Sequence, residues 1–281
     1  MFEAAIKPSS PWHRDWQDEG HVRLFDSRSV LSDRALVGHY EAFNDILLLG
    51  EILSRNPKVS LLEAGCATGE LYRYLQIRYP SVRYHGLDIS RAALERARQK
   101  YPQGRFLLHD PEVPLASTLH AADLARPMEV IYAKDVVHHQ TKPLEFLEQM
   151  LDLASEAAVF RLRTRDRGET VLDPELSCQY HYNGWVPYLV LNLQETINFV
   201  RARRPECELK VQRHPIILGG KENRYLPKEC YLPETGTAET AMAVWFHPER
   251  PGELQIEDRR DMQPPSPWYS RWRKRNGHPT G

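Results

Sequence analysis

The chain has 281 residues, of which 41% are hydrophobic, so it can bury the core of one large domain or of two small ones. Lys and Arg together number 37 against 38 Asp and Glu, which gives a formal net charge of -1 at pH 7. This balance excludes a chain that binds nucleic acid through a global positive field, and it argues against a disordered chain.

The N-terminus lacks the charged and then apolar pattern of a signal peptide, and no run of about 18 apolar residues is present. Cys66, Cys178, Cys207 and Cys230 show no CxxC spacing, which favours a reducing compartment over a disulfide framework. We therefore expect a cytoplasmic protein with no membrane span. No metal site is expected, although Cys178 and His181 leave a two-ligand site open as an alternative.

Residues 32–53 carry apolar side chains at three- and four-residue spacing and predict one amphipathic helix. Ser32 is its expected N-cap, and the residue before Pro57 ends it because proline disfavours the α conformation there. We assign residues 1–57 to an N-terminal helical lid segment.

Short strands and helices then alternate along the chain. Strands are expected at residues 59–63, 82–88, 105–110, 130–134 and 157–164, and helices at residues 70–78, 90–100 and 143–154. This alternation predicts a Rossmann-like α/β fold with a mostly parallel sheet and helices on both faces. Functional residues of such a sheet lie at the carboxyl ends of its strands.

The alternation loosens after residue 164. Residues 165–188 are expected to form a long loop over the mouth of the site, and residues 189–203 a helix. Strands at 208–213 and 241–247 are expected to form an antiparallel pair. The predicted sheet therefore has seven strands, the last one antiparallel, within a domain that covers residues 58–247.

Residues 248–281 are rich in proline and poor in aliphatic side chains, and they predict a loosely ordered tail. Residues 268–275 interleave aromatic side chains with four positive charges. Such a segment could stack on single-stranded RNA or bind an acidic protein, whereas a disordered basic end is the simpler interpretation.

The most informative segment is the turn after the first predicted strand, residues 63–69, with the sequence Glu-Ala-Gly-Cys-Ala-Thr-Gly. Glycine permits backbone conformations that other residues avoid, and the following helix directs free N–H groups at the turn. The absence of Gly-Lys-Ser/Thr excludes a P-loop, and the glycine spacing excludes a dinucleotide fingerprint. Glu63 would repel a pyrophosphate, so the turn suits a ligand with a cationic or zwitterionic end.

Acids end the next two predicted strands. Asp88 lies some twenty residues after the glycine turn, where a carboxylate accepts hydrogen bonds from ribose hydroxyls. Asp110 ends the third strand, where an acid can accept from an adenine amino group. The glycine turn, Asp88 and Asp110 follow three consecutive predicted strands in this order, and together they form a specific pattern.

This pattern resembles the class I S-adenosylmethionine-dependent methyltransferases. Their motif is an acid, any residue, Gly, Cys, Gly or Ala, Thr and Gly, and Ala67 stands at its middle glycine. The chain departs from many members at residues 155–157, which read Ser-Glu-Ala in place of Pro-Gly-Gly. The resemblance implies S-adenosylmethionine as cofactor, with Glu63 and Gly65 beside its amino-acid part. The cofactor-binding residues that we predict are Glu63, Gly65, Cys66, Ala67, Gly69, Asp88, Ile89, Asp110 and Lys134.

The turn after the fourth strand lies over the transferred methyl group in that family, and here it holds Asp135, His138 and His139 as candidate catalytic residues. Histidine titrates near neutrality and could deprotonate a hydroxyl. The alternative is that His139 only orients the turn, since many such enzymes rely chiefly on positioning.

The predicted substrate-binding residues follow the fifth strand or lie on it. Arg161 and Arg163 alternate along it and would share one face, where a guanidinium can bind a carboxylate. A solvated, salt-bridged edge is the alternative. Tyr182 and Trp185 lie in the aromatic loop and suit a ring-bearing acceptor.

We therefore predict a methyltransferase that acts on an oxygen or nitrogen of a small molecule, with an acidic group as one candidate feature. The alternatives are an RNA or protein methyltransferase and a non-catalytic partner protein that binds the cofactor. Residues 134–137 lack the Asn/Asp-Pro-Pro-Tyr/Phe motif of members that methylate amides and bases. A small-molecule acceptor is the expected partner, without membrane or nucleic acid, and a homodimer stays open.

Overall fold

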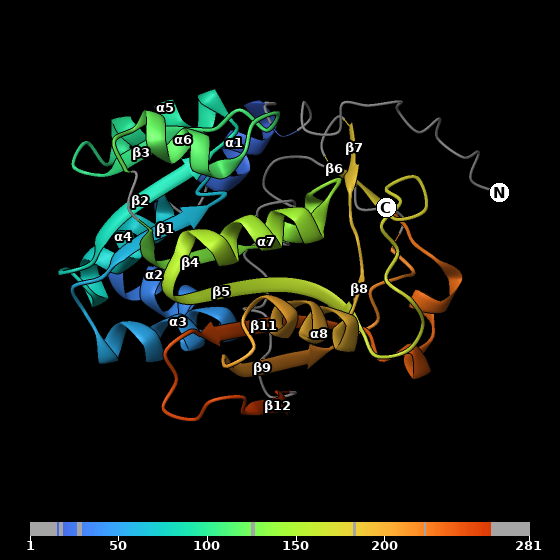
Figure 1. The fold of residues 1–281 in the computed structure, drawn as a ribbon. Helices are drawn as coiled ribbons and strands as arrows, with labels where there is room; N and C mark the ends of the chain where they lie inside the picture. Colours follow the sequence, from blue (N-terminus) through green and yellow to red (C-terminus); the bar gives the residue numbers. More distant parts are fainter. Residues whose placement is uncertain are drawn as a thin grey trace.

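The computed structural model describes residues 16, 19–26, 30–124, 127–181, 184–221 and 223–259. Its centre is a nine-stranded sheet with helices on both faces (Figure 1). Its strands are β1 (Ser60–Ala64), β2 (Arg83–Asp88), β3 (Arg105–Leu108), β4 (Met128–Lys134), β5 (Ala154–Arg165), β8 (Leu191–Asn192), β9 (Glu208–Pro215), β11 (Ala238–Trp245) and β12 (Leu254–Asp258).

The strand order is β12-β9-β11-β5-β4-β1-β2-β3, with β8 paired to β5. β11 runs antiparallel to both β5 and β9, whereas the other pairs are parallel. The predicted Rossmann-like sheet is confirmed, and β9 and β11 form the expected antiparallel pair. Because β5, β4, β1 and β2 are adjacent and parallel, their carboxyl ends meet at one edge of the sheet.

Alternation along the buried strands divides the core into two layers, one on each side of the sheet. Leu61 of β1 and Tyr132 of β4 pack on one side, and Leu62 and Ile131 pack on the other. The first layer lies under α2 (Asp33–Tyr40), α3 (Asn44–Arg55), α4 (Glu70–Arg78) and α5 (Arg91–Lys100). The second layer lies under α6 (Leu115–Ala121), α7 (Pro143–Leu153) and α8 (Leu193–Arg203).

The single helix predicted over residues 32–53 is wrong, since two helices, α2 and α3, occupy this segment. Ser32 caps α2 as expected, and its hydroxyl accepts from the Ala35 amide at 3.3 Å. Phe43 has an extended conformation, with φ -106° and ψ 135°, and interrupts the helical path. Another helix, α1 (Glu19–Asp26), precedes them and is connected to α5 by ion pairs of Asp26 with Arg96 and Lys100.

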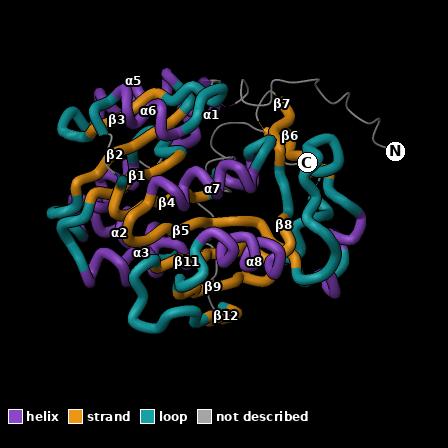
Figure 2. The backbone as a smooth tube through the Cα atoms, in the orientation of Figure 1, coloured by secondary structure: helices purple, strands orange, loops and turns teal. Residues whose placement is uncertain are grey.

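The long loop predicted over residues 165–188 contains a hairpin instead. Strands β6 (Cys178–His181) and β7 (Gly184–Pro187) pair with each other, and β10 (Arg224–Tyr225) pairs with β6. This three-stranded sheet lies beyond the carboxyl end of β5, at the right of Figure 1. The other segments at this end of the molecule are loops (Figure 2) and two short 3-10 helices, η4 (Lys228–Tyr231) and η5 (Pro233–Thr235).

The sheet has two strands more than the seven predicted, β8 and β12, and β12 lies in the predicted tail. β12 pairs in parallel with β9, so residues 254–258 belong to the sheet rather than to a loosely ordered end. β8 takes the first residues of the helix predicted at 189–203. Residues 260–281, which include the basic and aromatic stretch, lie outside the described residues.

Within the described ranges, no helix has the length and apolar content that crossing a bilayer requires. The same residues contain no group of three His, Cys, Asp or Glu side chains that could hold a metal ion. The four cysteines are buried thiols.

Candidate functional site

The glycine turn adopts the conformation that its sequence predicts. Gly65 and Gly69 have φ values of 79° and 80°, and Gly69 is the N-cap of α4. Ala67 also has a positive φ, 46°, which is strained for a residue with a side chain. The amides of Gly65 and Cys66 donate to the Leu87 carbonyl at 2.7 and 3.0 Å, so the turn is fixed to the end of β2.

Asp88 holds the glycine turn and the start of α5 together. Its Oδ2 accepts from the Ala67 amide at 2.7 Å, and its Oδ1 accepts from the Ser90 amide at 2.8 Å. Burial raises the pKa of Asp88, and these amides act in the opposite direction. Each carboxylate oxygen keeps a second lone pair, which suits the ribose hydroxyls predicted for this position. Ile89 follows directly and is half-buried.

Glu63 is buried at the end of β1, and its Oε2 accepts from the Tyr84 hydroxyl at 2.5 Å. Burial and the Glu63 charge raise the pKa of Tyr84 well above its usual value, so the phenol stays a donor. Burial likewise raises the pKa of Cys66, which therefore stays a thiol. The hydroxyl oxygen of Thr68 is buried and has no hydrogen-bond partner among the described residues. An unpartnered polar atom inside the turn fits a bound polar ligand.

Asp110 lies two residues beyond β3 and is exposed. Its Oδ1 accepts from the Glu112 amide at 3.0 Å. The adjacent His109 is buried and contacts the Thr118 hydroxyl at 2.8 Å through Nδ1. Sequence reasoning did not single out His109, although a polar residue before the terminal acid of a strand was a usable signal.

Lys134 ends β4 and turns toward the N-terminal helices. Its Nζ lies 3.4 Å from the ring centroid of Phe43 and 5.4 Å from that of Tyr40. The break between α2 and α3 therefore places Phe43 against this end of the sheet. Arg161 approaches the same ring, at 4.7 Å from the centroid.

The turn after β4 contacts the glycine turn. A Cβ on Gly65 would lie 2.3 Å from Cγ2 of Val136, so only glycine fits there. Asp135 precedes Val136 and has a φ of 57°. Its Oδ1 pairs with Arg163 Nη1 at 2.8 Å, and its Oδ2 with Arg161 Nη1 at 3.4 Å. Although burial opposes ionisation, the two arginines hold the pKa of Asp135 well below its usual range.

Arg161 and Arg163 share one face of β5, as predicted, but they are buried, with 8% and 7% exposure. Both also pair with Glu239 of β11, Arg163 at 3.4 Å. Asp45 of α3 lies 3.8 Å from Arg161 Nε. The two arginines therefore form neither a solvated edge nor an unpaired anion site. Sequence reasoning missed Asp45 and Glu239, although an acid within the apolar strand β11 was a signal.

Both candidate histidines are neutral at pH 7 in this environment. His139 Nδ1 lies 2.5 Å from the Pro187 carbonyl, so it donates, and Nε2 carries the lone pair. Burial lowers the pKa of His139 to about 4. His138 is fully buried, and neither ring nitrogen has a hydrogen-bond partner within the described part of the chain. Burial and the neighbouring His139 hold its pKa well below 6.5.

Aromatic side chains contact His139. The Trp16 ring lies 4.7 Å from the ring of His139 and 5.5 Å from that of His181. Trp185 contacts Tyr180 at 5.6 Å between ring centroids. The predicted residue Tyr182 lies outside the described residues.

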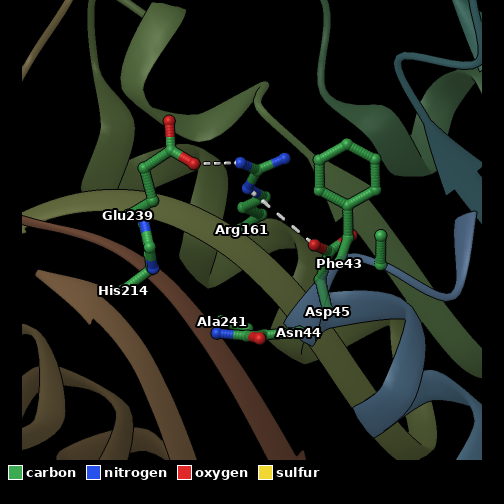
Figure 3. Close-up of a pocket in the computed structure, with 8 residues that line it drawn as sticks. Phe43, Asn44, Asp45, Arg161, His214, Glu239 and Ala241 are labelled. Atoms are coloured by element: carbon green, nitrogen blue, oxygen red, sulfur yellow. Dashed lines mark hydrogen bonds and ion pairs between the residues drawn. The ribbon is translucent and has the colours of Figure 1, made fainter. Parts of the chain in front are cut away.

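A small pocket with a cavity volume of about 20 Å³, enough for one water molecule or one small group of a ligand, adjoins the ion pairs. Arg161 lies between Glu239 and Asp45 in this pocket, with Phe43 at its side (Figure 3). The lining residues are Ala42, Phe43, Asn44, Asp45, Arg161, His214, Glu239 and Ala241. Arg161 pairs with Asp135 of the turn after β4 and with Glu239 of the pocket lining, so ion pairs link the pocket to this turn.

Comparison with known proteins agrees with this arrangement. Residues 62–160 match a family model for a methyltransferase domain. Magnesium protoporphyrin IX methyltransferase from Synechocystis PCC 6803 is 12% identical, with 86% of this chain and 99% of that chain covered and a TM-score of 0.49. An O-methyltransferase from a trans-AT PKS multienzyme of Brevibacillus brevis is 13% identical, with 85% and 80% covered and a TM-score of 0.48.

The [4+2]-cyclase SpnF is 11% identical, with 86% of this chain and 98% of that chain covered and a TM-score of 0.51. At this identity, the similarity to SpnF supports the fold alone. A search of curated proteins finds no significant match.

The contact between the two turns predicts the effect of Gly65→Ala. The added methyl would meet Val136 at 2.3 Å in a left-handed conformation, so we expect a loss of about 3 kcal/mol in the free energy of unfolding. Gly38→Ala is the control, because a Cβ on this glycine of α2 meets nothing within 4 Å. Urea denaturation measures both variants, and equal stability of Gly65→Ala and the wild type would contradict the described contact.

The histidine environments predict a loss of stability in mild acid. Burial lowers the pKa values of His85, His109, His138 and His139, so the unfolded chain binds protons more readily below about pH 6.5. The free energy of unfolding should therefore fall with decreasing pH, by about 1 kcal/mol between pH 7 and 5.5 for a histidine like His139. Denaturation across this range should show a shallower pH dependence of the free energy of unfolding for His138→Leu than for the wild type.

Proposed function

We propose, on the premise that residues 62–160 make this chain a member of the class I S-adenosylmethionine-dependent methyltransferases, that it methylates an oxygen or nitrogen of a small molecule. The resemblance predicted from the glycine motif is thereby confirmed, and the methyl acceptor is the new part of the proposal. The observation that carries it is the contact of the glycine turn with the turn after β4, where Val136 lies against Gly65. The pocket linked to this turn through Arg161 has room for one small chemical group.

The residues at the carboxyl edge fit S-adenosylmethionine, which supplies a methyl group on a positively charged sulfur when it is bound. Glu63 provides negative charge at the end of β1. The Asp88 carboxylate is oriented by two backbone amides and can accept further hydrogen bonds from the ribose hydroxyls. Thr68 provides an unpartnered hydroxyl inside the turn. We assign Gly65, Cys66, Ala67 and Gly69 to backbone contact, and Asp110 to the adenine end.

Asp135 and the two histidines would act on the acceptor side. Asp135 is committed to two arginines and stays ionised, so it shapes the site rather than accepting a proton. His139 has a lone pair on Nε2, but its pKa of about 4 makes it a weak base. We therefore assign to His139 the positioning of the acceptor, and we expect alignment to supply most of the rate.

Related folds carry more than one reaction, since the similar SpnF is a [4+2]-cyclase. The activity assay must therefore measure formation of S-adenosylhomocysteine and the mass of the methylated product. Screening metabolites with mass detection of a 14-dalton gain separates methyl transfer from cofactor binding alone, where about 14 is the mass of an added CH2.

Cofactor binding is tested by thermal and chemical unfolding with S-adenosylhomocysteine. At 100 times its dissociation constant, the ligand should add about 2.7 kcal/mol to the free energy of unfolding. Asp88→Ala should lose most of this gain, because it removes the ribose acceptors and releases the Ala67 amide. Asp152→Ala changes an exposed acid on α7 and should keep the full gain. No stabilisation of the wild type would refute the cofactor assignment.

The role of His139 is tested by His139→Gln. A positioning role predicts a fall in kcat of less than about tenfold and an unchanged pH dependence between pH 4 and 8. A general base would contribute about a hundredfold or more, and its loss would also remove an inflection near its pKa of about 4 from the pH–rate profile. Rates of S-adenosylhomocysteine formation from pH 4 to 8 distinguish the two roles.

A further inference from the structure

The pocket beside Arg161 has a polar lining that the proposed function leaves unexplained. Its residues come from the start of α3, from β5 and from β9 and β11 (Figure 3). Arg161 links it to Asp135, and Val136 then contacts Gly65 of the cofactor turn. These contacts connect the pocket to the turn that the family resemblance places over the transferred methyl group.

Two oxygen atoms in the lining are buried without a donor. Oδ1 of Asn44 and Oδ1 of Asp45 have no hydrogen-bond partner among the described residues. The exposed fractions of these residues are 9% and 0%. Tyr132 donates to the other Asp45 oxygen, Oδ2, at 2.5 Å, whereas Arg161 Nε stays 3.8 Å from Oδ1, which is too far for a hydrogen bond. Buried acceptors are normally paired, so these two oxygens point to a missing donor.

The remaining polar groups add acceptors and negative charge. His214 Nδ1 lies 3.1 Å from the Arg259 carbonyl and donates to it, so Nε2 is left as an acceptor. Burial opposes ionisation of Glu239, but Arg163 and Arg161 outweigh it and lower the pKa of this carboxyl. Arg161 is the one cationic side chain in the lining, against the carboxylates Asp45 and Glu239. It is already paired with Glu239 and Asp135.

We propose that this pocket binds an amino group of the methyl acceptor, held by Asn44 Oδ1, Asp45 Oδ1 and the Glu239 carboxylate. A protonated primary or secondary amine brings two or three N–H donors and one positive charge, which matches these oxygens. An anionic group would instead face two carboxylates and compete for an arginine that is already paired. The inference rests on the proposed methyl transfer, because it names the acceptor of that same site.

A protonated amine has no lone pair and cannot attack a methyl group. The amino group is therefore a recognition group in this pocket, and another oxygen or nitrogen of the same molecule receives the methyl. Asn44 and Asp45 are specificity-determining residues in this assignment. An acidic acceptor, which the sequence left open, would meet two arginines that already pair with Asp135 and Glu239.

The test uses benzylamine, benzyl alcohol and benzoate as probes that share one ring and differ in the polar group. Binding of each to the full chain saturated with S-adenosylhomocysteine is measured by calorimetry. We expect benzylamine to bind at least tenfold more tightly than the other two. Asp45→Asn should remove most of this preference, because it removes the charge and keeps an oxygen for Tyr132. Glu51→Gln is the matched control, since Glu51 lies on the same helix but pairs with Lys210 at 2.7 Å.

The outcomes separate this inference from the proposed function. If S-adenosylhomocysteine stabilises the chain but benzylamine fails to bind, or binds no better than benzoate, the amine assignment is overturned and the cofactor assignment stands. If S-adenosylhomocysteine does not stabilise the chain, the proposed function is the part that is refuted. Retention of the amine preference by Asp45→Asn would also overturn the assignment, provided that the variant unfolds at the wild-type temperature. If that variant does not fold, Asn44→Ala must weaken benzylamine binding for the assignment to stand.

Discussion

The ion pairs between Asp135 and the two arginines of β5 fix the geometry of the whole site. They hold a residue with a positive φ of 57°, a conformation that costs on the order of 1–3 kcal/mol where it is imposed on a side chain. The same pairs bring Val136 against Gly65, so the turn after β4 and the cofactor turn share one rigid contact. Arg161 also pairs with Glu239, so the ion pairs connect the antiparallel strand β11 to the site.

Buried charges of this kind are a poor source of net stability, because desolvation offsets most of their attraction. Their effect here is on arrangement. Arg161 contacts acids from α3, from the β4 turn and from β11, so it sets the distance between three elements that are remote in sequence. Phe43 packs beside this guanidinium and beside Lys134, which explains why the chain leaves the helical path between α2 and α3. A continuous helix would carry that ring away from the site.

Local sequence patterns were enough to predict β1 to β5, their connecting helices near Gly69 and Ser90, and the acids at the strand ends. These features depend on periodicity, capping and glycine conformation, all of which act over a few residues. The hairpin β6–β7, the strand β12 and the partners Asp45 and Glu239 were not predicted. Each depends on pairing with residues far along the chain, as β12 does with β9 and Glu239 with Arg161. Alternation along β5 correctly placed the arginines on one face but could not identify the acids opposite them.

The pairing of those arginines changes what their charge implies for the acceptor. Arginines gathered on one strand left an anionic acceptor open as long as they were counted alone. Opposite them, Asp45, Asp135 and Glu239 supply three negative charges. Lys134, whose Nζ lies 3.4 Å from the ring centroid of Phe43, adds a third positive charge to those of the two arginines. The charge of the arginines is therefore compensated within the site, whereas two buried oxygens of the pocket lining lack donors. Specificity for a donor-rich group follows from these unpaired acceptors rather than from the total charge.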